Sequence, residues 1–283
     1  MIHRITFITP LFSKGSYDDR PEIRPASIRG QLHWWFRALG HDHKDEKAVF
    51  GSVHNGTSAS KIVVRVSNIT EKPGQANTLP HKYGGEASPK AAFLPGTSFD
   101  LWITERLGGL NERLRAAFLR TLEAWLLLGT LGLRATRAAG SFVWEPQADS
   151  PLVPSPDLSA YACRVKEVLA NTPLQATIIP QPFDSAEEAR RVVSDTIGKA
   201  KGHSAPDPLL KYNHPLGKIH GSRKTSPLRF RIIQVGGSHH IVAVWDGRSN
   251  ITGNSPKDRD GVIRLLVEKD KKIGHLLLQH PFA

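Results

Sequence analysis

The sequence predicts an α+β fold, and the order of its periodic segments is the main evidence. Short stretches in which apolar and polar residues alternate indicate strands, and two longer stretches with helical spacing lie between them. A third observation is an apolar content of 39%, which is enough to bury a core in a chain of 283 residues. Strands are expected at 2–9, 61–69, 97–104 and 141–145, and helices at 27–39 and 111–128. This β-α-β-β-α-β order is that of a ferredoxin-like unit.

Within the first half, the helix at 111–128 has the clearest pattern. Asn111 is the expected N-cap, Phe118 and Leu122 belong to its apolar stripe, and Gly129 ends it. The connection at about 70–96 is long and rich in proline and glycine. A connection of that length in a compact fold is usually functional or disordered.

The second half has a less regular pattern. Four prolines at 146–157 indicate a linker, so we predict an N-terminal domain at 1–150 and a C-terminal domain at 151–283. Helices are expected at 157–170, 185–200 and near 257–270, strands at 228–235, 239–246 and near 274–279, with a tight Gly236-Gly237-Ser238 hairpin. Element order alone suggests a second, degenerate ferredoxin-like domain, because no exact repeat relates the halves.

The charge balance predicts a polyanionic partner. Thirty-eight Lys and Arg face 26 Asp and Glu, for a net charge of +12 and a pI of about 10.0, and such an excess favours RNA or DNA over an anionic membrane. The single cysteine, Cys163, excludes an internal disulfide. Residues 1–12 do not have the pattern of a signal peptide, and the longest apolar run is too short to span a bilayer. We therefore expect a soluble cytoplasmic protein.

The helix at 27–39 combines an apolar face with a basic one. Arg29, His33 and Arg37 recur every four residues on the side opposite the core, and Trp34 is turned towards them. Ser27 is the expected N-cap, and Arg24 precedes it. A helix start with basic residues attracts anions, and Gly30 allows a backbone to approach closely. The pattern indicates phosphate binding, and the alternative is a solvated basic face with a tryptophan at its rim.

Two further segments carry candidate residues for a polyanion. Arg134 and Arg137 lie in a turn that ends at Gly140-Ser141. Small residues and arginines in such a turn suit close approach to a phosphate chain. An ordinary helix-to-strand connection explains the segment equally well. Residues 199–226 contain six basic residues, among them Arg223 and Lys224, against one acid. This excess suggests a flexible arm over a polyanion, and the alternative is a plain disordered loop.

Several motifs together resemble the RAMP superfamily of CRISPR type III effector proteins, with the subunit-one family of type III-B Cmr complexes as the nearest pattern. They are TPLF at 9–12, PASIRG at 25–30, WWFR at 34–37, FGS at 50–52, SK at 60–61 and SPL at 226–228. The resemblance implies two ferredoxin-like domains, binding of CRISPR RNA that includes Lys61, a place at one end of a multi-subunit filament, and a thumb-like insertion at 70–96. One departure is TRAAGS at 136–141, where the family's glycine-rich loop has lost one glycine and one arginine.

The predicted function is therefore a non-catalytic, RNA-binding subunit of a type III CRISPR effector complex. Its partners would be the guide RNA, the complementary target RNA and other RAMP subunits, without a membrane, metal or cofactor. The alternative is a metal-dependent endoribonuclease that cuts target RNA with Asp18 and Asp19. A third possibility is metal-free acid–base cleavage by His33. Zinc is disfavoured because CxxC and HExxH patterns are absent.

Overall fold

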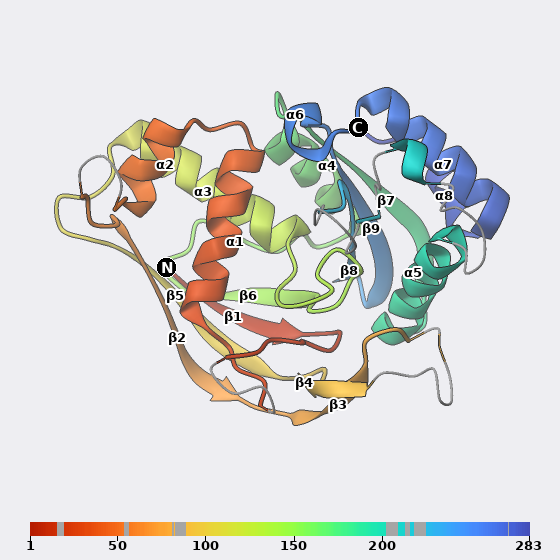
Figure 1. Ribbon diagram of the computed structural model, residues 1–283. Coiled ribbons are helices and arrows are strands. Elements are labelled where there is room, and N and C mark those ends of the chain that lie inside the picture. Colours follow the sequence, from red (N-terminus) through yellow and green to blue (C-terminus); the bar gives the residue numbers. More distant parts are fainter. Residues whose placement is uncertain are drawn as a thin grey trace.

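The computed structural model describes residues 1–15, 20–53, 57–80, 82, 89–201, 209–212, 216–217, 225–270 and 272–283. It contains two antiparallel sheets packed with helices and one two-stranded sheet (Figure 1). The predicted α+β fold class is confirmed.

The first sheet has the ferredoxin-like strand order β2-β5-β1-β6, with every neighbouring pair antiparallel. Its strands are β1 (Ile2–Phe7), β2 (Ile62–Thr70), β5 (Ser98–Glu105) and β6 (Phe142–Ala148). The two long helices, α1 (Pro25–Ala38) and α3 (Glu112–Leu128), bury their apolar stripes in one core with this sheet. Apolar and polar residues alternate along β1, and this alternation places Ile5 and Phe7 on its buried face.

The connection between β2 and β5 contains a hairpin of β3 (Pro73–Asn77) and β4 (Pro89–Phe93), which pair antiparallel. The hairpin is tied to the body of the protein because Leu11 and Phe93 exchange backbone hydrogen bonds of 2.9 and 3.0 Å. Helix α2 (His43–Phe50) was not predicted. It has eight residues and many charges, so its periodic signal is weak, although Asp42 caps it by accepting from the Asp45 N–H at 2.7 Å.

The second half contains a three-stranded sheet of order β7-β9-β8. Its elements are α4 (Leu158–Leu169), β7 (Leu174–Phe183), α5 (Ala186–Lys201), a 3-10 turn (Leu210–Tyr212), β8 (Leu228–Val235), β9 (Ser238–Asp246), α6 (Ser249–Thr252), α7 (Pro256–Asp270) and α8 (Ile273–Gln279). The order matches the first three strands of a ferredoxin-like unit. At the place of the fourth strand, Ala283 exchanges two 3.0 Å backbone hydrogen bonds with Ala176 of β7.

For the second half, one prediction is wrong and one strand was missed. The segment near 274–279 is helix α8 rather than a strand, because Ile273 and Leu277 lie one turn apart and are both buried. Strand β7 was not predicted, because its LQATIIPQPF sequence contains two prolines and little alternation. The β8–β9 hairpin is confirmed: Val235 pairs with Ser238 across Gly236-Gly237, both of which have positive φ.

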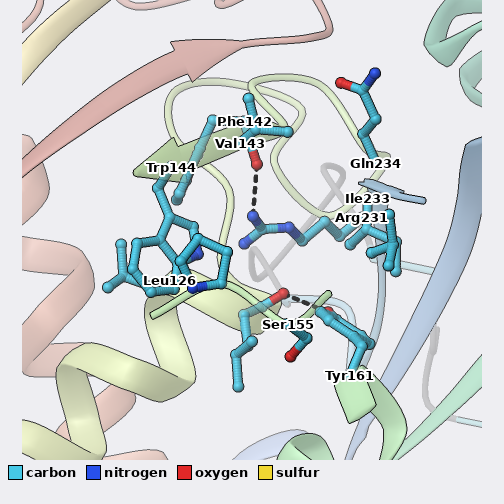
Figure 2. Close-up of a pocket in the computed structure, with 12 residues that line it drawn as sticks. Leu126, Phe142, Val143, Trp144, Ser155, Tyr161, Arg231, Ile233 and Gln234 are labelled. Atoms are coloured by element: carbon cyan, nitrogen blue, oxygen red, sulfur yellow. Dashed lines mark hydrogen bonds between the residues drawn. The ribbon is translucent and has the colours of Figure 1, made fainter. Parts of the chain in front are cut away.

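The two halves share buried contacts. Arg231 of β8 is 3% exposed and donates to the carbonyl oxygens of Trp125 (3.2 Å), Gly129 (2.5 Å) and Phe142 (2.6 Å) in the first half. Figure 2 shows this side chain in a small cavity of about 60 Å³, beside Tyr161. The apolar core around α1 and α3 also continues through α4 and one face of the second sheet. A domain boundary near residue 150 therefore stays a prediction.

Candidate nucleic-acid interface

Helix α1 begins at Pro25, two residues earlier than predicted, and Ser27 is not its N-cap. Arg24 has the N-cap position with an extended backbone, Pro25 is the first helical residue, and the Arg24 side chain makes no capping hydrogen bond. The Ser27 N–H donates to the Arg24 carbonyl at 3.0 Å, so Ser27 lies inside the first turn. A proline at the first helical position is common because it has no N–H to satisfy, and this explains the displaced start.

A groove of about 380 Å³ runs along the start of this helix. We call it the α1 groove, and its lining residues are Phe12, Ser13, Lys14, Ser27, Gly30, Gln31, Leu131, Gly132 and Leu133. Gly30 is exposed, and a Cβ built on it would meet nothing within 4 Å. The groove therefore joins the first turns of α1 with the loop at 129–141, which is more than 90 residues away in sequence.

The loop at 129–141 is held close to the segment that follows β1. The Leu133 N–H donates to the Phe12 carbonyl at 2.6 Å, and the Gly140 N–H donates to the Pro10 carbonyl at 2.9 Å. Gly140 has a φ of 65°, and a Cβ there would lie 1.9 Å from the Leu131 carbonyl oxygen, so only glycine fits. Ser141 is 0% exposed and its hydroxyl donates to the Ala138 carbonyl at 2.9 Å. Gly140 and Ser141 are therefore buried residues that determine the conformation of this loop.

Arg134 and Arg137 are the unusual residues of the loop. Both are half-buried, and in the part of the chain that the structure describes neither guanidinium has a hydrogen-bond or ion-pair partner. Burial lowers the pKa of Arg134 and lowers that of Arg137 to about 10, with a smaller contribution from neighbouring arginines. Both side chains remain protonated at neutral pH. Burying cations without anions is costly unless a ligand supplies the negative charge.

Arg190 of α5 belongs to the same basic region, although no sequence pattern singles it out. Its guanidinium lies 5.5 Å from the centre of the Phe12 ring and donates to the Asn77 carbonyl of β3 at 2.8 Å. Glu187 pairs with it at 3.0 Å. Arg190 lies within an ordinary amphipathic helix, so its local sequence does not distinguish it. It comes near the loop only through the fold.

The predicted basic face of α1 is partly covered by α2, and its basic side chains are bonded to that helix, although Arg37 stays 54% exposed. Arg29 donates to the Phe50 carbonyl oxygen, and the His33 Nδ1 lies 2.6 Å from the Glu46 Oε1. Arg37 lies 3.5 Å from the same carboxylate, which is only 7% exposed. Burial lowers the pKa of His33, although the Glu46 hydrogen bond opposes this shift. The side chains of Arg29, His33 and Arg37 therefore already have partners within the protein.

Trp34 packs against the second half. The guanidinium carbons of Arg229 and Arg248 lie 3.7 and 5.4 Å from its ring centre. Lys61 lies at the opposite end of the first sheet from the α1 groove, where it precedes Ile62, the partner of Glu105. The structure thus brings together Ser27, Gly30 and the loop carrying Arg134 and Arg137, but neither Lys61 nor the α2-covered face of α1.

Four candidates lie outside the described residues, namely Asp18, Asp19, Arg223 and Lys224. Among the residues that the structure does describe, no group of three or more His, Cys, Asp or Glu could hold a metal ion. Within the same residues, no helix is long and apolar enough to cross a membrane.

Comparison with curated proteins finds two relatives from Pyrococcus furiosus. "CRISPR system Cmr subunit Cmr1-2" is 36% identical over 76 residues, covering 24% of this chain and 39% of that protein. "CRISPR system Cmr subunit Cmr1-1" is 28% identical over 142 residues, covering 43% of this chain and 40% of that protein. The chain thus matches about two fifths of the length of each relative.

Comparison with solved structures shows the same fold. The crystal structure of apo Cmr1 from Pyrococcus furiosus has a TM-score of 0.57 at 20% identity, over 87% of each chain. A chain of the type III-B Cmr-beta complex bound to cognate target RNA has a TM-score of 0.64 at 10% identity, over 94% of this chain and 98% of that one. At these identities, the likeness establishes the fold alone.

The family model of the RAMP superfamily matches residues 4–143. This segment includes the TPLF, PASIRG, WWFR, FGS and SK motifs, the loop at 129–141 and the first sheet from within β1 to the start of β6. The resemblance indicated by the motifs is confirmed, and the segment that forms the α1 groove belongs to the RAMP superfamily.

Proposed function

We propose that this chain is a non-catalytic RNA-binding subunit of a type III CRISPR effector complex, acting in antiviral defence. It would hold the guide RNA and the backbone of the guide–target duplex at one end of the filament, next to other RAMP subunits. The proposal is supported by relatives named as Cmr subunits and by similar chains in complexes bound to target RNA. Sequence recognition in such a complex comes from base pairing, so the protein needs only backbone contacts.

The observation that carries this proposal is the pair of half-buried guanidinium groups of Arg134 and Arg137. In the described part of the chain they have no carboxylate partner, and they follow Leu133 at the edge of the α1 groove. Arginine is well suited to phosphate because its N–H groups match two phosphate oxygens. An RNA strand in the groove could place phosphates against this pair while its backbone passes the exposed Gly30.

The test is a salt series of binding to single-stranded RNA of guide length, measured by fluorescence anisotropy. Wild type is compared with the double variant Arg134→Gln/Arg137→Gln, and the RNA is checked on a gel after each titration. Loss of two phosphate contacts should reduce the slope of log K against log salt by about 1.4. An unchanged slope and affinity would contradict the proposed site, and cut RNA would contradict the non-catalytic role.

A further inference from the structure

A second groove lies at the junction of α1 with the second half of the protein. Its volume is about 500 Å³, within the range of small-ligand sites. Figure 1 shows the short helix α6, which forms one wall, beside the C-terminal half of α1. We call it the junction groove, and its lining residues are Trp34, Thr225, Ser226, Arg229, Asp246, Ser249, Asn250, Ile251, Thr252 and Gly253.

The charges at this groove leave one cation unpaired. Asp246, 3% exposed, accepts from Arg248 Nε at 2.8 Å and from Arg248 Nη2 at 2.6 Å. This bidentate pair uses both carboxylate oxygens and is neutral as a unit. Arg229 has no hydrogen-bond or ion-pair partner among the described residues, and its buried Nε is unsatisfied. Among the described residues, the groove therefore carries a surplus charge of one guanidinium.

Stacking holds Arg229 in place without using its hydrogen-bond donors. The guanidinium carbon lies 3.7 Å from the ring centre of Trp34, and such contacts involve the face of the guanidinium and leave its in-plane N–H groups available. Burial lowers the pKa of Arg229 to about 10, although nearby Asp246 opposes the shift, so the side chain is charged at neutral pH. An anionic ligand would compensate for the cost of this burial.

Neutral donors surround the surplus charge. The side chains of Thr225, Ser249 and Asn250 are exposed and form no hydrogen bond within the described chain. One positive charge with neutral donors matches a phosphodiester, which carries one negative charge. A carboxylate of a protein partner would suit the charge, but the chain's net charge of +12 favours a polyanionic strand.

The two grooves lie along one face of α1. Gly30 lines the α1 groove and Trp34 lines the junction groove, and residues four apart in a helix are neighbours on its surface. A single strand could therefore pass from one groove to the other along the helix.

We infer that the junction groove binds one nucleotide of a single-stranded RNA, with its phosphate against Arg229 and the side chains of Thr225, Ser249 and Asn250 around it. The inference rests on the proposed RNA-binding function but concerns a separate site. The position of Trp34 in the WWFR motif is explained by this site, because its ring orients Arg229 at the groove.

The experiment follows the Arg229 Nε–H resonance in ¹⁵N NMR spectra of the full chain, assigned by its loss in Arg229→Lys. The probes are a short oligouridylate, uridine monophosphate and, as an uncharged control, uridine. The test variant is Ser249→Glu, which places a negative charge at an exposed position of the groove, and Ser249→Gln is its matched control. Anisotropy with the same RNA measures overall affinity in parallel.

We expect the oligouridylate and the monophosphate to shift the Arg229 resonance and uridine to leave it unchanged. Ser249→Glu should abolish the shift and weaken RNA binding about fivefold, while Ser249→Gln, which loses the hydroxyl but adds no charge, should keep the shift and weaken binding by less than about twofold. An unmoved Arg229 resonance in a chain that binds RNA by anisotropy would overturn the inference and leave the proposed function intact. A shift with the monophosphate but not with RNA would also overturn it, in favour of a free nucleotide. Absence of any RNA binding would overturn the proposed function itself.

Discussion

The basic face of α1 and the loop at 129–141 have similar charge in the sequence, but the fold uses the two differently. On α1, Arg29 and His33 bond to the Phe50 carbonyl and the Glu46 carboxylate of α2. In the loop, Arg134 and Arg137 are half-buried without a partner among the described residues. The comparison shows that basic residues indicate a polyanion site only where intramolecular acceptors leave their charge uncompensated.

The largest expected effect is on RNA affinity. Arg134→Gln/Arg137→Gln should weaken binding of single-stranded RNA by about a hundredfold, because two charge-assisted hydrogen bonds to phosphate are lost. Arg29→Gln/Arg37→Gln removes the same formal charge from the face covered by α2 and should weaken binding by less than about threefold. Anisotropy titrations at one salt concentration measure both. Equal losses would show that the α1 face contributes as much as the loop.

Next in size is the stability of the α1–α2 contact. Glu46→Gln should destabilise the fold by about 2 kcal/mol, because it removes the buried carboxylate that His33 and Arg37 share. Asp260→Asn, which removes an exposed partner of Arg259, is the control and should change stability by less than about 0.5 kcal/mol. Urea denaturation measures both, and RNA affinity should stay the same in each. A Glu46→Gln protein as stable as the control would show that the α2 contact is weak.

The sequence predicted much of the first half because its elements are long and periodic. The alternation in β1 and the stripe of α3 with its Asn111 cap determine which faces are buried, and the structure agrees with both. Helix α2 was missed because eight mostly charged residues have no such stripe, and strand β7 because prolines interrupt it. Missing α2 had the larger consequence, since α2 determines which basic residues of α1 are already bonded.

The site was predicted only in part, for a related reason. Motifs identified Gly30, Arg134 and Arg137, which are local features of the chain. Arg190 and Arg229 reach their positions through contacts with Phe12 and Trp34, residues of the other half. Periodicity within one segment carries no information about such contacts between halves.

A smaller effect distinguishes the starts of the two long helices. Asn111→Ala should cost about 1 kcal/mol of stability, because its side chain accepts from the Leu114 N–H at 2.9 Å and caps α3. Ser27→Ala should cost less than about 0.5 kcal/mol, because Ser27 lies inside the first turn of α1. Thermal unfolding of both variants measures the difference. A loss at Ser27 equal to that at Asn111 would restore the N-cap prediction.

The smallest expected effect is the response of RNA affinity to pH at His33. Burial lowers the pKa of His33 below its usual 6.5, so this side chain is neutral at pH 7 and gains a proton only at lower pH. The unfolded chain takes up that proton first, so the contribution of His33 to stability is present above pH 6.5 and is lost as the pH falls. The guanidinium of Arg137, with a pKa of about 10, does not titrate in this range.

We therefore expect wild type and His33→Gln to show the same change in RNA affinity between about pH 8 and about pH 6, a range in which the fold persists. Anisotropy titrations at both pH values give the two ratios, and circular dichroism confirms that each protein remains folded. If the face of α1 contacts RNA, protonation of His33 adds a positive charge near phosphate, and affinity rises more at the lower pH in wild type than in His33→Gln. A ratio that differs between the two proteins would therefore show that the face of α1 covered by α2 makes part of the RNA contact that we assign to the loop at 129–141.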